Sequence, residues 1–150
     1  MNRSSTGNMQ AIVKYSSISV QTEVENASPY RLVQMLLNGA LARIAMARIS
    51  IGQGEIARKG EYISSAIAII GGLKDSLDHK IGGTVSANLE KLYTYMMDRL
   101  LEASMKNDTG ILNEVNELLS GIKSSWDEIG EIPEAKIPQQ MTDLQHRKTG

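Results

Sequence analysis

The segment that begins at Val85, directly after Gly82-Gly83-Thr84, constrains the fold of this chain more than any other. Apolar residues recur there every three or four positions, which is the spacing of one face of an α-helix. That face comprises Val85, Leu89, Leu92, Met96, Leu100 and Ala103. A second apolar row runs beside it and comprises Tyr93, Met97 and Leu101. One row can pack into a core, whereas the second row needs another neighbour, inside the protein or outside it.

Three other segments show the same periodicity. The first follows Ser28-Pro29, which supplies a capping hydroxyl and a proline suited to the first helical position. A second helix is expected from Glu55 to Leu77, and His79–Gly83 is expected to form the turn before the third helix. The fourth is expected over Asp108–Ile129. Four helices with short connections predict an all-α fold, an antiparallel four-helix bundle.

The two ends of the chain lack sustained periodicity. Residues 1–27 are rich in Ser, Thr and Asn, and residues 131–150 contain two prolines among mostly polar residues. Segments of this kind bury too little apolar surface to order themselves. The sequence therefore predicts a flexible N-terminal arm at 1–27, a bundle at 28–130 and a disordered tail at 131–150.

Composition excludes several classes of protein. The net charge is −1, with 16 basic and 17 acidic residues, so the basic face of a nucleic-acid-binding protein is not expected. The chain has no cysteine, which excludes disulfides and thiolate metal sites and favours a cytoplasmic location. There is no uninterrupted run of about 18 apolar residues, so we expect no membrane insertion.

Catalytic chemistry is not expected either. A di-iron bundle requires Glu-x-x-His motifs on two helices, and neither His79 nor His146 has a glutamate three positions before it. The Gly71-Gly72-Leu73-Lys74 segment lacks the spacing of a phosphate-binding loop. We therefore expect a protein that is not an enzyme, with no catalytic residues, no metal and no cofactor.

Four short signatures occur in order along the predicted helices. They are Ala27-Ser28-Pro29 with Leu32, Met35-Leu36 and Asn38-Gly39-Ala40-Leu41; Ala66, Ile69-Ile70, Leu73 and Ser76-Leu77-Asp78; Gly82-Gly83 with Asn88-Leu89, Leu92-Tyr93, Tyr95-Met96 and Arg99-Leu100; and Leu112, Glu114-Val115, Leu118-Leu119 and Trp126. In this order and spacing the chain resembles the flagellin-specific export chaperones of the FliS family, from about Tyr15 to Ile129. The family usually shows Tyr-Asp-Gly where this chain has Leu37-Asn38-Gly39.

The resemblance implies a function. Chaperones of this family bind the disordered C-terminal segment of newly made flagellin in the cytoplasm and block its premature polymerisation. They also help to present flagellin to the flagellar type III export gate, and other flagellar assembly factors are further expected partners. A disordered client of this kind can wrap a large surface and fold into helices as it binds.

Candidate binding residues come from two sources. Helical phase places six residues on the surfaces that a partner helix could occupy, although each could equally belong to the core: Tyr62, Ile69, Leu73, Tyr93, Met97 and Leu101. The resemblance implies that the N-terminal arm can fold over the client groove as a cap. Tyr15 matches the family's aromatic position ahead of the first helix, and we expect Ile12, Tyr15 and Ile18 to form this cap.

Two other functions fit the same periodicity. A structural or adaptor bundle could pair with another helical protein or with itself as a homodimer, since an exposed apolar groove supports either. A metal-dependent oxidoreductase bundle is the third alternative, and the missing histidine motifs disfavour it. Binding of a flagellin C-terminal peptide would separate the chaperone from the adaptor, and metal analysis would test the third alternative.

Overall fold

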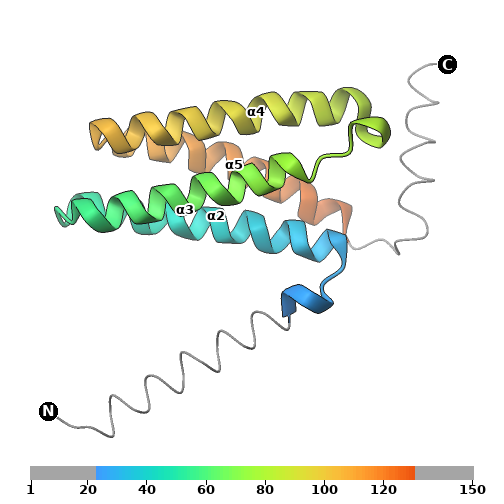
Figure 1. The fold of residues 1–150 in the computed structure, drawn as a ribbon, viewed down its shortest axis with the longest axis horizontal. Helices are drawn as coiled ribbons and strands as arrows, with labels where there is room; N and C mark the ends of the chain where they lie inside the picture. The colour runs from blue at the N-terminus through green and yellow to red at the C-terminus, as the bar shows by residue number, and fades with distance from the viewer. Residues whose placement is uncertain (1–22, 131–150) are drawn as a thin grey trace, which may run out of the picture.

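The computed structural model describes residues 23–130, which form four long helices (Figure 1). Their bounds are Pro29–Gly52 for α2, Ile56–Asp75 for α3, His79–Lys106 for α4 and Thr109–Ile129 for α5. A further helical turn covers residues 23–26, ahead of α2. No strand occurs within the described residues, so the all-α prediction is confirmed.

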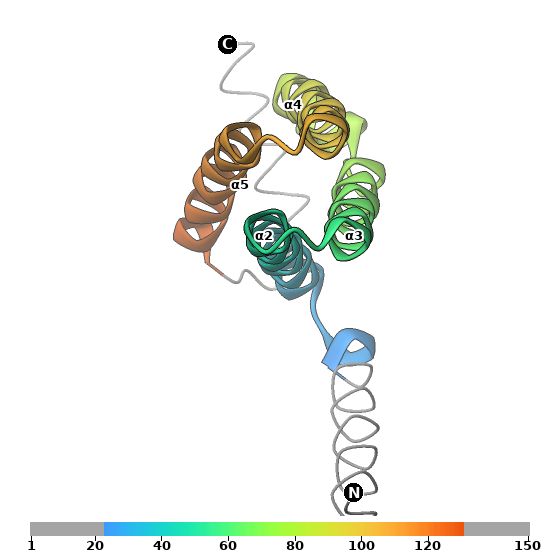
Figure 2. The same cartoon turned by 90° about the vertical axis from the view of Figure 1, so that its left-hand side faces the viewer.

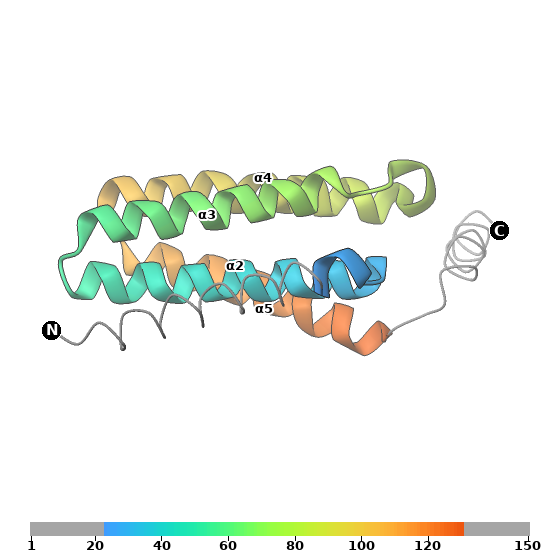
Figure 3. The same ribbon diagram turned by 60° about the horizontal axis from the view of Figure 1, so that its bottom comes forward.

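The four helices form a closed ring. Helix α2 packs against α3 and α5, and α4 packs against the same two helices (Figure 2). Consecutive helices run in opposite directions because their connections are short (Figure 3). This arrangement confirms the predicted antiparallel bundle. The predicted tail at 131–150 and most of the predicted arm at 1–27 lie outside the described residues.

The core is apolar and draws on all four helices. Its buried members are Leu37, Ala40, Ile44, Ala47, Ile63, Ala66, Ile70, Leu73, Tyr93, Met96, Leu100, Ala103, Ile111, Leu112, Val115 and Leu119. Fully burying an aliphatic side chain of this kind contributes about 1.5–3 kcal/mol relative to leaving it exposed. The bundle is therefore held together mainly by apolar packing among these buried side chains.

Side-chain caps define where the helices begin. The Ser28 hydroxyl accepts a hydrogen bond from the Arg31 N–H at 3.1 Å, directly before Pro29. The Asp108 carboxylate accepts from the N–H groups of Gly110 and Ile111 at 2.8 and 3.2 Å. These contacts satisfy backbone donors that have no partner within the helix. The predicted cap at Ser28 is thus confirmed.

The segment His79–Gly83, predicted as a turn, is a short helical turn at the start of α4 that Gly83 separates from the main part of the helix. Asp78 caps a short helical turn, and Gly83 then interrupts the helix with φ 50° and ψ −123°. The Ser86 hydroxyl donates to the Asp78 carbonyl at 3.0 Å, which holds the turn against the main part of α4. A Cβ on Gly82 would lie 1.8 Å from the Ser86 Oγ, so this packing requires glycine there.

The ring closes where the first and last long helices meet. The rings of Tyr30 and Trp126 stack with centroids 5.4 Å apart, and the Trp126 Nε1–H donates to the Tyr30 carbonyl at 3.0 Å. The Gln34 amide donates to the Asp127 carboxylate at 2.8 Å, one turn further along α2. These contacts join the start of α2 to the end of α5.

Helix α2 is long and apolar enough to cross a membrane by length and composition alone. The expectation of no such segment rested on the lack of an uninterrupted apolar run, and charged and polar residues interrupt the run in α2. Leu37, Ala40 and Ile44 of this helix are buried in the bundle core. The stripe on α2 is therefore used for packing between helices.

Candidate partner-binding grooves

The structure does not bring the six predicted groove residues together in one groove. Leu73 and Tyr93 are 1% and 3% exposed and belong to the core. For these two residues the structure thus favours the core alternative that the sequence left open. The reason is the rotation of α4 in the ring, which turns Tyr93 inward together with Met96 and Leu100. Burial raises the pKa of the Tyr93 phenol, as expected for an acid withdrawn from water.

Tyr62 and Ile69 lie on the side of α3 that faces α2. Both are half-buried and pack against the edge of the core. The Ile69 Cδ1 lies 3.5 Å from the point where a Cβ on Gly39 would be, so α2 and α3 approach closely there. Near Tyr62 the two helices leave an open pocket of about 290 Å³, whose lining residues are Ala42, Arg43, Met46, Glu61, Tyr62 and Ser65.

Met97 and Leu101 lie on a different face, where α4 adjoins α3. The Met97 Cε is 3.5 Å from the point where a Cβ on Gly71 would be, an ordinary van der Waals distance, so Met97 of α4 packs beside Gly71 of α3. Leu101 follows one helical turn later and is 55% exposed. Helix α3 therefore presents Tyr62 and Ile69 toward α2 and Gly71 toward α4. The four accessible candidates divide between two surfaces and remain predicted binding residues.

Apolar side chains that the sequence analysis did not select are also exposed. Met46 and Ile49 lie near the end of α2, Ile56 begins α3, and Met105, 77% exposed, lies near the end of α4. The antiparallel topology places these segments toward the same end of the bundle. Met46 and Ile49 do not belong to the buried row of α2. Their positions outside this row are the sequence signal that they face outward.

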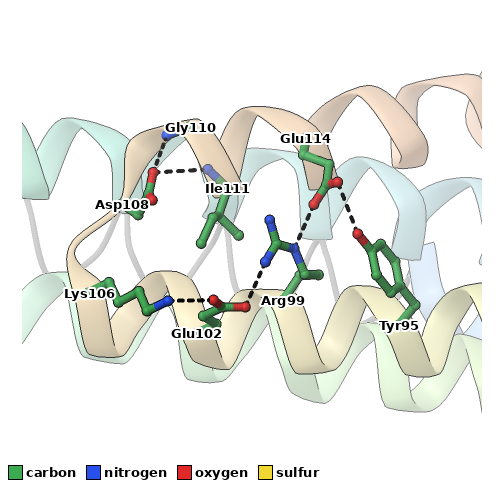
Figure 4. A network of polar contacts seen from close by, with 8 residues as sticks. All are labelled: Tyr95, Arg99, Glu102, Lys106, Asp108, Gly110, Ile111 and Glu114. Carbon is green, nitrogen blue, oxygen red and sulfur yellow. Dashed lines mark hydrogen bonds and ion pairs between the residues drawn. The ribbon is translucent and has the colours of Figure 1, made fainter.

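The outer side of the α4–α5 pair is polar instead. The Arg99 guanidinium bridges Glu114 of α5 at 2.7 Å and Glu102 of its own helix at 2.6 Å (Figure 4). The Tyr95 hydroxyl donates to Glu114 at 2.9 Å, and the Lys106 ammonium bridges Glu102 at 2.7 Å. These contacts tie α4 to α5, and they make this side unlike the apolar grooves beside α3.

The charges in this network shift the acidity of its carboxyl groups. Hydrogen bonds from Arg99 and then Tyr95 hold the pKa of Glu114 below its usual value. Hydrogen bonds from Lys106 and then Arg99 lower the pKa of Glu102 in the same way. Both glutamates lie at the surface, so solvent screens these interactions. The network acts as a clasp between two helices.

Metal-binding chemistry has no site in the part of the chain that the structure describes. Within residues 23–130, no group of three or more His, Asp or Glu side chains is placed to hold a metal ion. His79 lies in the short turn that begins α4, where its Nε2 is 2.9 Å from the Glu90 carboxylate.

Comparison with known proteins gives the family. Residues 10–133 match the family model described as flagellar protein FliS. The flagellar secretion chaperone FliSB of Pseudomonas aeruginosa is 46% identical over 121 residues, which cover 81% of this chain and 96% of that protein.

The flagellar secretion chaperone FliS of Salmonella typhimurium is 44% identical over 119 residues, which cover 79% of this chain and 88% of that protein. The FliS of Bacillus subtilis is 37% identical over 106 residues, which cover 71% of this chain and 78% of that protein. The family model spans most of the chain, and each of these relatives is at least 37% identical over 71% or more of it. This chain therefore belongs to the FliS family of flagellar proteins.

Proposed function

We propose that this chain is a cytoplasmic flagellar secretion chaperone that binds the C-terminal segment of flagellin. Bound in this way, flagellin is kept from polymerising prematurely and is delivered to the flagellar type III export apparatus. The proposal rests on membership of a family whose relatives are named flagellar secretion chaperones. The chain would act by binding alone, without enzymatic activity.

The observation that carries the proposal is the surface on both sides of α3. Tyr62 lines the α2–α3 pocket and Ile69 lies further along the same contact, whereas Met97 and Leu101 lie on the face where α4 adjoins α3. An amphipathic helix docks on such surfaces by placing apolar side chains at intervals of three or four residues. Two partly apolar surfaces on one bundle suit a client that wraps around it.

The physics of a disordered client also fits a carrier that must release its cargo. A segment that folds as it binds can contact a large area, yet it loses conformational entropy on ordering. That loss offsets about 2–5 kcal/mol of the gross interaction energy, so affinity per unit area is modest. The complex can thus be specific without being irreversible.

Calorimetric titration with a synthetic peptide of the flagellin C-terminal segment tests this function directly. We expect one peptide to bind per chain, with a gain of helical circular dichroism beyond the sum of the two components. Ser124→Glu on the outward face of α5 is a suitable control, because Ser124 is exposed and lies away from α3. Absence of binding at micromolar concentration would argue against the proposal.

A second candidate function is that of an adaptor bundle that self-associates or binds another helical protein. The exposed apolar residues toward one end of the bundle favour it, notably Ile49, Ile56 and Met105. Sedimentation of the full chain without peptide distinguishes this candidate. A dimer that Ile56→Glu and Met105→Glu both dissociate would support the adaptor.

A further inference from the structure

We propose that Arg43 makes the α2–α3 pocket selective for a peptide that carries a carboxylate beside an apolar side chain. The pocket is the one lined by Ala42, Arg43, Met46, Glu61, Tyr62 and Ser65. This inference rests on the proposed function, because the occupant is taken to be the client segment. It goes further by stating the chemistry that the client must present at this place.

The guanidinium of Arg43 is held in a defined position. Its Nε donates to the Ser65 hydroxyl on α3 at 3.0 Å, and its Nη1 donates to the Gly39 carbonyl on α2 at 3.2 Å. Both acceptors are neutral. The side chain is half-buried between the two helices, so its position is set before any partner arrives. Such preorganisation reduces the entropy lost on binding.

Arg43 has no carboxylate within ion-pair distance among the described residues, although most arginines there have one. Arg31, Arg58 and Arg99 each contact an acidic side chain within residues 23–130. Arg48 also lacks an ion pair in this region, but it is exposed and donates to the Asn113 amide at 2.9 Å. Among the arginines of the described residues, a half-buried guanidinium with only neutral partners therefore occurs only in the α2–α3 pocket.

The bonding capacity of Arg43 is not filled by its two neutral partners. A guanidinium has five N–H donors in a planar fork that matches the two oxygens of a carboxylate. Within the described residues its Nη2 makes no hydrogen bond. A carboxylate in the pocket would supply both an acceptor and the opposite charge. The preferred ligand group is thus an Asp or Glu side chain or a terminal carboxylate.

The remaining walls define what must accompany the carboxylate. Met46 and Tyr62 present apolar surface on opposite helices, so an aliphatic or aromatic side chain of the client fits between them. Glu61 lines the same pocket and would repel a second carboxylate. The occupant is therefore an apolar segment with one acidic group placed toward Arg43, since a uniformly acidic segment would be disfavoured.

Substitutions of opposite sign test this assignment. The probe is a synthetic peptide of the flagellin C-terminal segment from the organism that carries this chain. Arg43→Gln should weaken its binding about 5- to 10-fold, because a charge-assisted hydrogen bond is lost. Glu61→Gln should strengthen binding about 2-fold by removing the repulsion. Arg48→Gln, the matched control on the same helix, should leave affinity unchanged.

A double-mutant cycle identifies the peptide group. Each Asp or Glu of the peptide is replaced in turn by its amide, and each peptide is titrated against the unaltered chain and Arg43→Gln. One peptide substitution should weaken binding to the unaltered chain about 5- to 10-fold and have no further effect on Arg43→Gln. If Arg43→Gln fails to fold, the titrations against the unaltered chain still test the proposal, because no effect of any amide substitution would overturn it.

The outcomes separate this inference from the proposed function. If the unaltered chain does not bind the peptide, both are overturned. If it binds, and neither Arg43→Gln nor any amide peptide changes the affinity, the selectivity of Arg43 is overturned and the chaperone function stands. If sedimentation shows a dimer that both Arg43→Gln and Glu61→Gln dissociate, the pocket belongs to a second copy of the chain, which also overturns the inference.

Discussion

The ammonium of Lys59 donates to the Oδ1 of Asn107 at 2.7 Å, joining the first turns of α3 to the residue that ends α4. The same nitrogen donates to the Ser104 carbonyl at 2.8 Å. Asn107 has the left-handed backbone of a helix C-cap, with φ 50° and ψ 43°. Lys59 is only 6% exposed, and both of its acceptors lie at the C-terminal end of α4. Its positive charge therefore lies at the negative end of the helix dipole.

Replacing Lys59 by methionine should destabilise the bundle by about 1–3 kcal/mol, because the acceptors on Ser104 and Asn107 would lose their donor while the aliphatic stem is kept. Urea unfolding followed by circular dichroism measures the change. Lys91→Met, at an exposed position of α4, is the control and should shift the midpoint little. Equal midpoints for the two variants would show that the Lys59 cap has no net stabilising effect.

Two glycines should respond to alanine with opposite signs. Gly83→Ala should destabilise the chain by about 1–3 kcal/mol, because a residue with a side chain is strained at the φ of 50° that interrupts α4. Gly72→Ala should stabilise it by about 0.5–1 kcal/mol, since Gly72 lies in α3 and a Cβ there would meet open space. Thermal unfolding of the pair measures both, and two shifts of the same sign would contradict the assignment.

Acid should weaken the clasp between α4 and α5. The pKa values of Glu102 and Glu114 are lowered in the folded chain, so the unfolded chain binds more protons at mildly acid pH. Their stabilisation is present above the ordinary glutamate pKa of about 4.3 and is lost as pH falls through the lower folded values.

Removal of Arg99 should flatten this dependence. Arg99→Met removes the main hydrogen bond that lowers the Glu114 pKa and one of the two that lower the Glu102 pKa, so its free energy of unfolding should fall less between about pH 5 and pH 3. Urea titrations across that range make the comparison, with Arg48→Met as control because Arg48 pairs only with an amide. A slope in Arg99→Met as steep as that of the unaltered chain would exclude the clasp as its source.

Charged substitutions distinguish groove from core. Leu101→Glu should remain folded and lose affinity for the flagellin peptide about 10-fold, because Leu101 is exposed beside α3. Tyr93→Glu should unfold the bundle, since it would place a charge in the core. Circular dichroism and calorimetry on the same samples measure both properties. A folded Leu101→Glu variant with full affinity would remove Leu101 from the predicted site.

The predicted N-terminal cap lies outside the described residues and is tested by deletion. If Ile12, Tyr15 and Ile18 cover a client groove, a chain without residues 1–19 should bind the peptide more tightly or self-associate more readily. Calorimetry and light scattering on the shortened and full-length chains measure these effects. No change in affinity or solubility would contradict the cap.

Periodicity was sufficient to predict the bundle but not the rotation of each helix within it. Ser28 and Asp108 mark their helix starts through local hydrogen bonds, which depend only on residues a few positions away. Val85 belongs to the first apolar row of α4 and is exposed, whereas Tyr93 belongs to the second row and is buried. Two apolar rows on one helix leave its rotation open, and the neighbouring helices decide it.

The Arg43 pocket shows the same limit for a binding site. Arg43 stands between apolar residues of α2, so the sequence alone shows a charged residue on this helix but not that it lies in a pocket. Arg43 and Ser65 are 22 positions apart in the chain, so their contact depends on the register between α2 and α3. Helical phase selects Tyr62 and Ile69 together with Met97 and Leu101. Only the packing of the four helices shows that the two pairs lie on different faces. Local patterns thus predict the elements, and tertiary register creates the site.

Trp126 is the sole tryptophan of the chain, and it stacks on Tyr30 where the ring closes. Its indole N–H bonds a carbonyl 96 positions earlier in the chain. The molecule consequently carries an intrinsic fluorophore at the seam between its first and last long helices. The fluorescence emission of Trp126 therefore reports the separation of α5 from α2, and with it the opening of the bundle, without any attached label.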